Sequence, residues 1–284
     1  METGVVLSIG GISLTIRGGE SLAWVRALPG MAAFRGDRRN ENVDIRLDEQ
    51  LSLPECRWLH RFGIVDDTAE CRFGIATDGV YYFTFSGGGV LRFDPQRPDT
   101  VCLTAMANPN ILCFALWTAY SLTGLWHNAV PMHASVVVCR DRAVLCLGES
   151  GTGKSTHTSL WIKYIEGSHL LNDDSPVLRV EGDEVVVYGS PWSGKTPCFR
   201  QERVPVAALL RLEQRPENKI RRLGVVEAFT ALHPSCPPAL AHDERCTDRM
   251  VDFIGGVIDH VPVYRLGCRP DEEAARLAYN TIMA

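Results

Sequence analysis

The chain has 284 residues and a net charge of −5. Hydrophobic residues make up 45% and charged residues 22% of the chain, which is the balance of a folded globular protein and excludes a disordered one. A nucleic-acid-binding protein usually carries a basic stripe, and this charge balance argues against that class. The length allows one large domain or two small ones.

The cysteines and the first residues of the chain indicate the cellular compartment in which we expect the protein. The sequence holds ten cysteines but no C-x-x-C pair, and Met1–Gly4 is not a basic region followed by an apolar run. We therefore expect free thiols, no secretory signal and a cytoplasmic protein. The sequence leaves homo-oligomer formation open.

Residues 1–104 predict a β-rich region. Apolar runs with short glycine-containing turns between them are typical of hairpins. The first expected hairpin joins Val5–Ile9 to Ile12–Ile16, and the second joins Val80–Phe85 to Val90–Phe93. The glycines between the second pair of strands have no lysine and lead into a strand, so they indicate a turn rather than a phosphate loop. Asp66 and Asp67 lie in a polar stretch that predicts a solvated loop remote from any site.

Ile111–Trp126 is the longest apolar segment. It is shorter than the ~20 residues needed to span a membrane and contains several hydroxyl side chains. Asn108 can cap a helix and Pro109 suits the first helical turn. We therefore expect a buried internal helix and no membrane partner.

Residues 105–284 interleave expected strands and helices, which predicts an α/β domain. The expected strands are His133–Cys139, Ala143–Leu147, His169–Leu171, Val177–Val180, Glu184–Tyr188, Val206–Leu212 and Val261–Leu266. The expected helices run from the glycine-rich loop to about Ile165, over Thr247–Val257 and over Asp271–Thr281. The predicted organisation is a β-rich region, 1–104, followed by this α/β domain.

A phosphate-binding loop is predicted between the second of these strands and the helix after it. Gly148-Glu149-Ser150-Gly151-Thr152-Gly153-Lys154-Ser155 fits G-x-x-x-x-G-K-[ST], and Thr156 follows in the helix. Glycines let several backbone N–H groups face one anion, and the helix start favours negative charge. We expect Lys154 to be exposed, to reach the β- and γ-phosphates of ATP, and Ser155 to hold Mg²⁺.

A second segment fits the same pattern, Gly189-Ser190-Pro191-Trp192-Ser193-Gly194-Lys195-Thr196. Pro191 removes one backbone donor, and Pro197 follows at once, so no helix is expected there. This segment does not predict an anion site of its own. Lys195 is instead a candidate to serve the first loop.

Two adjacent carboxylates follow the loop. Asp173 lies nineteen residues after Lys154, which is room for one helix, a connection and a short strand. A βαβ unit would place the carboxyl end of that strand beside the phosphate loop. One of Asp173 and Asp174 could then ligate Mg²⁺ and the other accept a proton from a hydroxyl. Alone, the same residues would suit a polar turn.

The loop, the Asp173-Asp174 pair and His133-Ala134-Ser135 together resemble the HPr kinase/phosphorylase family and, more distantly, the ATP-dependent phosphoenolpyruvate carboxykinases. The resemblance covers residues 130–200. It implies a P-loop domain of this type, with Lys154 and Ser155 serving phosphates and metal, and the two aspartates serving as metal ligand and base. His133 aligns with a histidine near the kinase active site, or it is a core histidine at a strand start. Lys195 would neutralise charge on the phosphoryl group.

The Glu-Val-Arg-Gly-Leu-Gly type of signature that HPr kinases carry after the aspartates is absent here. The expected function is therefore an ATP- and Mg²⁺-dependent kinase acting on a hydroxyl of an unknown small molecule, peptide or protein, with HPr a poor substrate. The alternative is a nucleotide-responsive regulatory protein with little turnover, which needs the phosphate loop but no general base. Metal-assisted decarboxylation of the carboxykinase type is a third reading.

Overall fold

The computed structural model describes residues 4–37, 41–64, 68–194 and 196–284. The chain folds into two compact units, one of Met1–His127 with Ala239–Cys246, the other of Asn128–Pro238 with Thr247–Ala284. Each unit contains one large mixed sheet, so the fold is mixed α/β. The sequence pattern suggested a division after residue 104. The units divide after His127 instead, because the long apolar helix packs on the strands that precede it.

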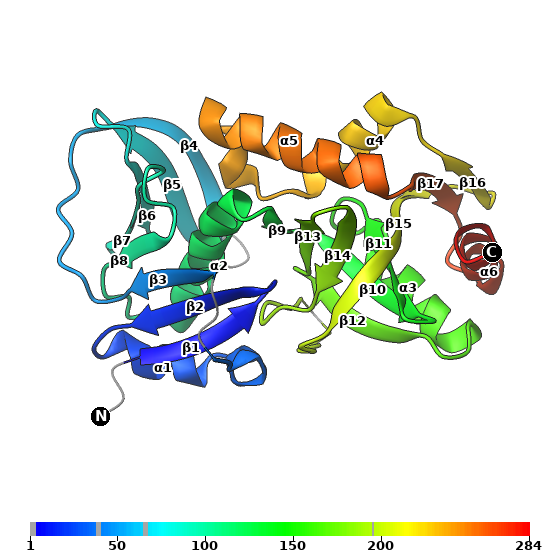
Figure 1. Ribbon diagram of the computed structural model, residues 1–284, viewed down its shortest axis with the longest axis horizontal. Helices are drawn as coiled ribbons and strands as arrows, with labels where there is room; N and C mark the ends of the chain where they lie inside the picture. The colour runs from blue at the N-terminus through cyan, green and yellow to red at the C-terminus, as the bar shows by residue number, and fades with distance from the viewer. Residues whose placement is uncertain (1–3, 38–40, 65–67, 195) are drawn as a thin grey trace. The chain divides into compact units, whose positions relative to one another are not determined.

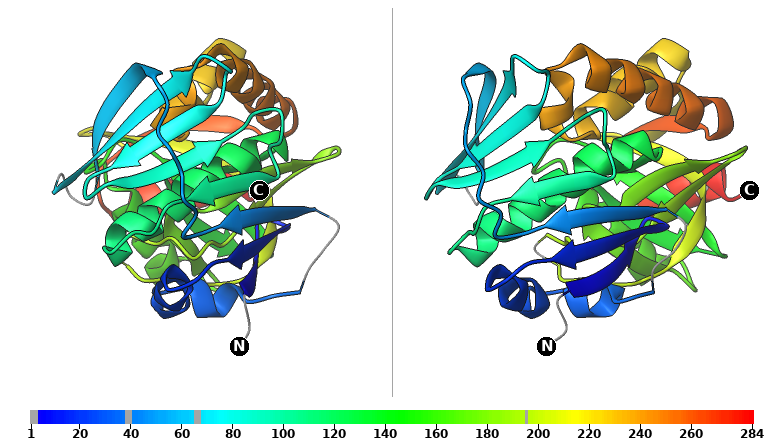
Figure 2. Two further views of the ribbon diagram at one scale, coloured as in Figure 1. Left: turned by 90° about the vertical axis from the view of Figure 1, so that its left-hand side faces the viewer. Right: turned by 60° about the vertical axis from the view of Figure 1, so that its left-hand side comes forward.

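The sheet of the first unit has the strand order β1-β2-β3-β8-β7-β6-β5-β4 (Figures 1 and 2). Its strands are β1 (Gly4–Ile9), β2 (Ile12–Arg17), β3 (Asn42–Arg46), β4 (Cys56–Ile64), β5 (Ala69–Ala76), β6 (Tyr81–Phe85), β7 (Gly89–Phe93) and β8 (Thr100–Leu103). The described helices of this unit are α1 (Ser21–Ala27), the short η1 (Met31–Phe34) and α2 (Pro109–Trp126). Both predicted hairpins, β1–β2 and β6–β7, are confirmed as antiparallel pairs. Asp66 and Asp67 lie outside the described residues.

Helix α2 begins as predicted. The Asn108 side chain accepts hydrogen bonds from the N–H groups of Asn110 (2.9 Å) and Ile111 (3.4 Å), and Pro109 occupies the first turn. The hydroxyls of Thr118 and Ser121 donate to backbone carbonyls one turn earlier, which satisfies them inside an apolar environment. Within the described residues, no helix is long and apolar enough to cross a membrane.

The sheet of the second unit has the order β12-β10-β11-β15-β14-β13-β9, with β17 on β15 and β16 on β17. Its strands are β9 (Ala129–Pro131), β10 (Ala134–Cys139), β11 (Arg142–Leu147), β12 (His169–Asp174), β13 (Val177–Glu181), β14 (Glu184–Tyr188), β15 (Arg203–Gln214), β16 (Lys219–Arg222) and β17 (Val263–Cys268). Its helices are α3 (Lys154–Tyr164), α4 (Val225–Leu232), the short η2 (His233–Ser235), most of α5 (Glu244–His260) and α6 (Glu272–Ile282); the short η3 (Pro238–Ala241) leads back into the first unit.

Strand directions determine where the site forms. β10 pairs antiparallel with both β11 and β12, so β11 and β12 run the same way without being neighbours. β15 is parallel to β11, and β17 is parallel to β15. Four strands therefore end at one edge of the sheet, which is where α/β sheets place their ligands. The predicted βαβ unit is thus a crossover that skips one strand, β10.

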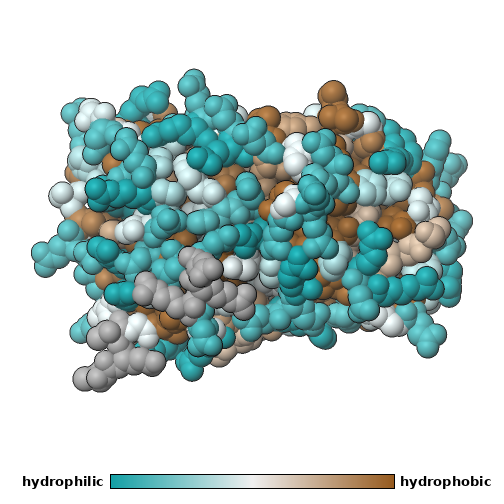
Figure 3. Space-filling model, viewed as in Figure 1, coloured by the Kyte–Doolittle hydropathy of each residue, from teal (hydrophilic) through white to brown (hydrophobic). Residues whose placement is uncertain are grey.

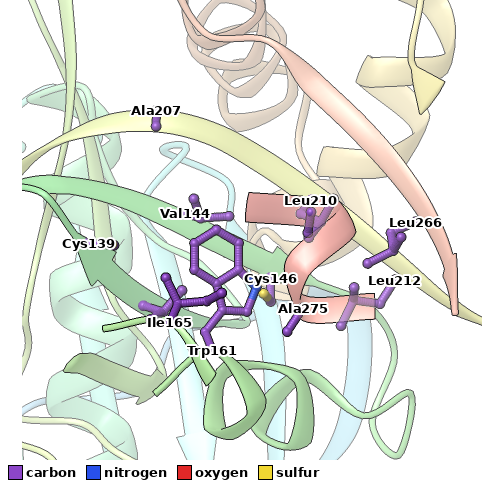
Figure 4. Close-up of a cluster of buried hydrophobic side chains, with 12 residues drawn as sticks. Cys139, Val144, Cys146, Trp161, Ile165, Ala207, Leu210, Leu212, Leu266 and Ala275 are labelled. Carbon is purple, nitrogen blue, oxygen red and sulfur yellow. The ribbon is translucent and has the colours of Figure 1, made fainter. Parts of the chain in front are cut away.

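Helix α3 is anchored to the sheet by one large side chain. Trp161 is fully buried, and Figure 4 shows its ring among Val144, Ile165 and Leu210. Its indole N–H donates to Nε2 of His157 at 3.1 Å, so the polar atom is satisfied inside the core. A buried hydrogen bond of 2.9 Å between the hydroxyls of Ser135 and Thr158 also joins α3 to β10. The start of α3 is therefore held firmly against the sheet edge.

The surface facing the viewer in Figure 3 is mostly hydrophilic, with a brown protrusion over α4. There Val225 and Val226 are exposed by 71% and 78%.

All ten cysteines fall among the described residues, and none of them forms a disulfide.

Candidate active site

The phosphate loop leaves the carboxyl end of β11 and leads into α3. Gly151 and Gly153 have φ of +81° and +101°, which side chains rarely tolerate. A Cβ at Gly148 would lie 2.5 Å from the hydroxyl oxygen of Thr152, so that position needs glycine for space. The helix starts at Lys154 after Gly153, a residue with no side chain to cap it. The first N–H groups of α3 are thus available to an anion, as the sequence predicts.

Lys154 is buried, contrary to the expected exposed loop lysine, with 9% of its surface accessible. Its ammonium Nζ donates to the carbonyl oxygens of Gly148 (2.9 Å) and Glu149 (3.3 Å) and lies 3.0 Å from Nε2 of His133. The side chain therefore folds back over the loop that precedes it. Burial lowers the pKa of Lys154, and the nearby carboxylates of Asp174 and Asp173 oppose that shift.

The two aspartates at the end of β12 face different partners. The Ser155 hydroxyl donates to Oδ1 of Asp173 at 2.8 Å. Asp174 has φ of +119° and its Oδ1 lies 3.8 Å from Nε2 of His133. The structure therefore brings together Lys154, Ser155, Asp173, Asp174 and His133. Of the two readings of His133, the position beside the loop lysine is the one observed.

Asp174 and His133 influence each other's protonation. Partial burial raises the pKa of Asp174, and the charges of His133 and Lys154 act against that rise. Burial and the Lys154 charge lower the pKa of His133. About half of the Asp174 side chain, 51%, is accessible, so a substrate can reach it. A carboxylate with a raised pKa next to a phosphate loop is suited to accept a proton.

The second segment that fits the phosphate-loop pattern, which begins at Gly189, is hydrogen-bonded to the end of β12. The buried amide of Asn172 donates to the carbonyl oxygens of Ser190 (3.3 Å) and Trp192 (3.1 Å), and the Gly194 N–H donates to Asp173 O at 2.6 Å. A Cβ at Gly189 would lie 1.8 Å from the carbonyl oxygen of Arg200, so the backbone at these two positions packs too closely for any residue but glycine at 189. No helix starts in residues 196–202, as predicted. Lys195 lies outside the described residues.

Arg211 was missed by the sequence analysis. It lies opposite Leu147 in the β11–β15 register, directly before the phosphate loop. Its guanidinium donates to Oε1 of Glu149 at 2.9 Å, and this hydrogen bond lowers the pKa of Glu149. The sequence feature that could have pointed to Arg211 is its place near the carboxyl end of the strand expected at Val206–Leu212. Only the strand order reveals that this end adjoins the loop.

Comparisons with known proteins add little to this geometry. The chain matches no family model and no curated protein. Among solved structures it is similar to the HPr(Ser) kinase/phosphatase from Coxiella burnetii, over 54% of this chain and 93% of that chain, with 15% identity and a TM-score of 0.32. That likeness is too low to argue from. The functional assignment rests on the residues of the site.

Proposed function

We propose that the second unit binds ATP with Mg²⁺ at Gly148–Ser155 and transfers the γ-phosphoryl group to a hydroxyl acceptor. We propose further that it is a divergent P-loop domain of the HPr kinase/phosphoenolpyruvate carboxykinase type. One observation carries this function. β11 and β12 end at the same edge of the sheet, so that the Ser155 hydroxyl donates to Asp173, while Asp174 remains accessible beside His133 and Lys154.

The loop provides the phosphate cradle. The N–H groups of Lys154, Ser155 and Thr156 stand in the first turn of α3, where they have no partner within the helix and an anion is favoured. Lys154 is the cation of this cradle. Phosphate oxygens would replace the carbonyl oxygens of Gly148 and Glu149 as acceptors of its ammonium protons.

The residues at the metal position fit Mg²⁺. Ser155 Oγ and Asp173 Oδ1 are oxygen donors 2.8 Å apart, and Mg²⁺ is bound in such sites by one or two carboxylates together with substrate phosphates. Among the described residues, no group of three or more His, Cys, Asp or Glu side chains could hold a metal by itself. When bound, Mg²⁺ would neutralise charge on the phosphates. Asp173 and Ser155 are therefore the proposed ligands.

The transfer step then assigns Asp174 as the base. The acceptor oxygen forms a bond to the γ-phosphorus while the bond from the γ-phosphorus to the bridging oxygen breaks, and ADP leaves. The acceptor proton passes to the Asp174 carboxylate. His133 lies beside that carboxylate, and Lys195 is proposed to neutralise the moving phosphoryl group. Catalysis is then mostly positioning and charge neutralisation.

The accessible, basic carboxylate favours a kinase over a nucleotide-responsive regulator. A regulator requires the cradle and the metal but no proton acceptor beside the phosphates. Asp174 lies beside His133 with 51% of its side chain accessible, a position that a general base explains and a sensor does not require.

The test is a transfer assay with γ-labelled ATP and Mg²⁺. The acceptors are HPr in one arm and a pool of hydroxyl-bearing metabolites and peptides in the other, with the Asp174→Asn variant in parallel. The expected result is label on a component of the pool, slow ATP hydrolysis without acceptor, and a fall in both rates of about 10²- to 10⁴-fold in the variant.

Two outcomes would change the proposal. Rapid labelling of HPr that depends on Asp174 would show that the missing signature does not exclude HPr. Transfer and hydrolysis no faster in the parent than in Asp174→Asn would remove the kinase and favour the regulatory protein.

A further inference from the structure

Three arginines lie in one row across the neighbouring strands β15, β17 and β16 of the second unit (Figure 1). Arg211 on β15 is the register partner of Arg265 on β17, and Arg265 is the register partner of Arg221 on β16. Residues paired in this way across neighbouring strands project from the same face of a sheet. We call these three residues the arginine row.

The arginine row is on the face of the sheet away from α3 and α6. The next row along the same strands is Leu212, Leu266 and Ile220, and it packs with Trp161 of α3 and Ala275 of α6. Successive residues of a strand point to opposite faces, so the arginines point the other way. The guanidinium groups therefore belong to the surface of the sheet and not to its apolar core.

Stability does not explain this row, because like charges directly opposite one another on neighbouring strands destabilise a sheet. Each arginine has one carboxylate partner from outside the row: Glu149 for Arg211 (2.9 Å), Glu213 for Arg265 (3.3 Å) and Glu227 for Arg221 (2.5 Å). These carboxylate side chains are 70%, 32% and 45% accessible, and such exposed ion pairs contribute little to stability. The carboxylates of a ligand can therefore take their place.

A hollow of about 520 Å³ adjoins Arg265 and Arg221. Its charged lining consists of four cationic residues and two carboxylates: Arg215, Lys219, Arg221, Arg265, Glu213 and Glu217. Within the part of the chain that the structure describes, the buried Nε of Arg265 has no hydrogen-bond partner, although Glu213 lies 3.3 Å away. An excess of cationic groups with an unsatisfied donor favours an anionic ligand, and the guanidinium fork suits carboxylates.

The same register connects the arginine row to the proposed base. Leu147 pairs with Arg211 on one side and with Ala134 on the other, and Ala134 pairs with Asp174. Asp174 is therefore in line with the arginines, and four strand spacings separate it from Arg265. At ~4.8 Å for each spacing, the two backbone positions are about 19 Å apart.

This distance selects the kind of acceptor. An extended polypeptide covers ~3.3 Å per residue, so about six residues connect a hydroxyl at Asp174 with an acidic side chain at Arg265. Docking on Arg211 or Arg221 instead widens the interval to about four to seven residues. A small metabolite is too short to reach both places, whereas a polypeptide segment is long enough.

We propose that the acceptor is an acidic polypeptide segment. Its Asp or Glu side chains dock on the arginine row, and a serine or threonine hydroxyl about four to seven residues away reaches Asp174. The inference rests on the proposed phosphotransfer and names the class of its acceptor. Glu149, Glu213 and Glu227 pair with the arginines until the segment displaces them.

The first test measures docking without turnover. The probe is a fluorescein-labelled peptide in which a glycine spacer of about six residues joins a serine to a run of glutamates. Its fluorescence anisotropy is followed with the parent, Arg265→Gln, Arg221→Gln and Arg276→Gln. Arg276 is the matched control, an exposed arginine of α6 that pairs with Glu272 at 2.7 Å. The two row variants should weaken binding about tenfold, and Arg276→Gln should match the parent.

A peptide with glutamines in place of the glutamates completes this test. Equal affinity of the parent for the two peptides, or equal affinity of the row variants and Arg276→Gln for the glutamate peptide, would overturn the inference. A parent that binds ATP with Mg²⁺ but not the glutamate peptide would also overturn it and would leave the proposed function intact. A parent that binds no ATP would overturn the proposed function, and the acceptor with it.

Thermal scans of the same variants separate docking from a structural role. Because like charges face one another in the row, Arg265→Gln and Arg221→Gln should melt no lower than the parent. A lower melting temperature in both row variants would assign the arginines to folding and would overturn the docking role.

A transfer assay tests the spacing. The acceptors are glutamate peptides whose spacers have about one and about six residues, with γ-labelled ATP and Mg²⁺. The peptide with the longer spacer should be labelled about tenfold faster. Equal rates would overturn the inference. So would no labelling of either peptide by a parent that hydrolyses ATP in an Asp174-dependent way.

Discussion

The Ser155 hydroxyl donates a hydrogen bond to Oδ1 of Asp173 at 2.8 Å, although eighteen residues separate the two in the chain. The contact exists because α3 carries the chain from the end of β11, over β10, to β12, which runs in the same direction. In nucleotide-binding loops, this pair of oxygen ligands is where the magnesium ion of the nucleotide is held. The predictions below depend on that convergence.

The ammonium of Lys154 should be needed for nucleotide affinity. Because Lys154 is buried, Lys154→Met is preferable to alanine, since it keeps the side-chain length and removes only the charge. We expect the Kd for ATP with Mg²⁺ to rise by about tenfold or more, or about 1.4 kcal/mol, with a cooperative thermal transition retained. Calorimetry provides the measurement, and Lys163→Met on the exposed side of α3 is the matched control. An unchanged Kd would remove the phosphate loop from the proposal.

The rate should fall at low pH through Asp174. The base works only when ionised, and partial burial raises its pKa above the ordinary aspartate value, so the acid limb of kcat/KM should lie at a higher pH than a free carboxyl gives. The charge of His133 lowers the pKa of Asp174, so His133→Gln should move the limb to still higher pH. If the acid limb of kcat/KM in His133→Gln stays in place or moves to lower pH, the proposed interaction between His133 and Asp174 is wrong.

Asp174 should also lower stability at neutral pH. A carboxyl whose pKa is raised in the folded state stabilises the fold below its unfolded pKa, and that contribution is lost as pH rises through the folded pKa. Asp174→Asn should therefore melt at a higher temperature than the parent at pH 7 to 8, and the difference should shrink toward pH 4. Thermal scans across this range measure it, with Asp183→Asn in the exposed β13–β14 turn as control. A variant less stable than the parent at pH 7 would contradict the linkage.

Lys195 should act on the rate rather than on binding. It follows Gly194 in the sequence, and the Gly194 N–H donates to the carbonyl oxygen of Asp173. If it neutralises the transferring group, Lys195→Met should lower kcat by about tenfold or more and leave the ATP Kd within about twofold. Single-turnover rates and equilibrium binding separate these effects. A loss confined to Kd would assign Lys195 to ground-state phosphate binding.

Sequence reasoning located the parts of this site that are local. The loop, its helix and the β10–β11 hairpin follow from short patterns. The Arg140-Asp141 turn, with φ of +50° and +56°, joins the two strands expected at His133–Cys139 and Ala143–Leu147. The position of β10 between β11 and β12 could not be foreseen, because strand order depends on pairing between distant segments.

The same limit hid the supporting residues. Arg211 and Asn172 act through neighbours that are distant in sequence, Glu149 for the first and the Ser190–Trp192 backbone for the second. The Lys154 ammonium also has His133 as a neighbour, and that residue directly precedes β10, far from the loop in the sequence. The first unit was recognised as β-rich, but its parallel β2–β3 and β3–β8 pairs and the return of residues 239–246 leave no short-range pattern.

The most direct test of the central claim is a crystal structure with a non-hydrolysable ATP analogue and Mg²⁺. We expect the triphosphate along Gly148–Ser155, the metal on Ser155 Oγ and on Asp173 directly or through one water, and Asp174 within hydrogen-bonding reach of a γ-phosphate oxygen or its attacking water. A nucleotide bound elsewhere, or both aspartate side chains turned away from the phosphates, would contradict the phosphotransferase.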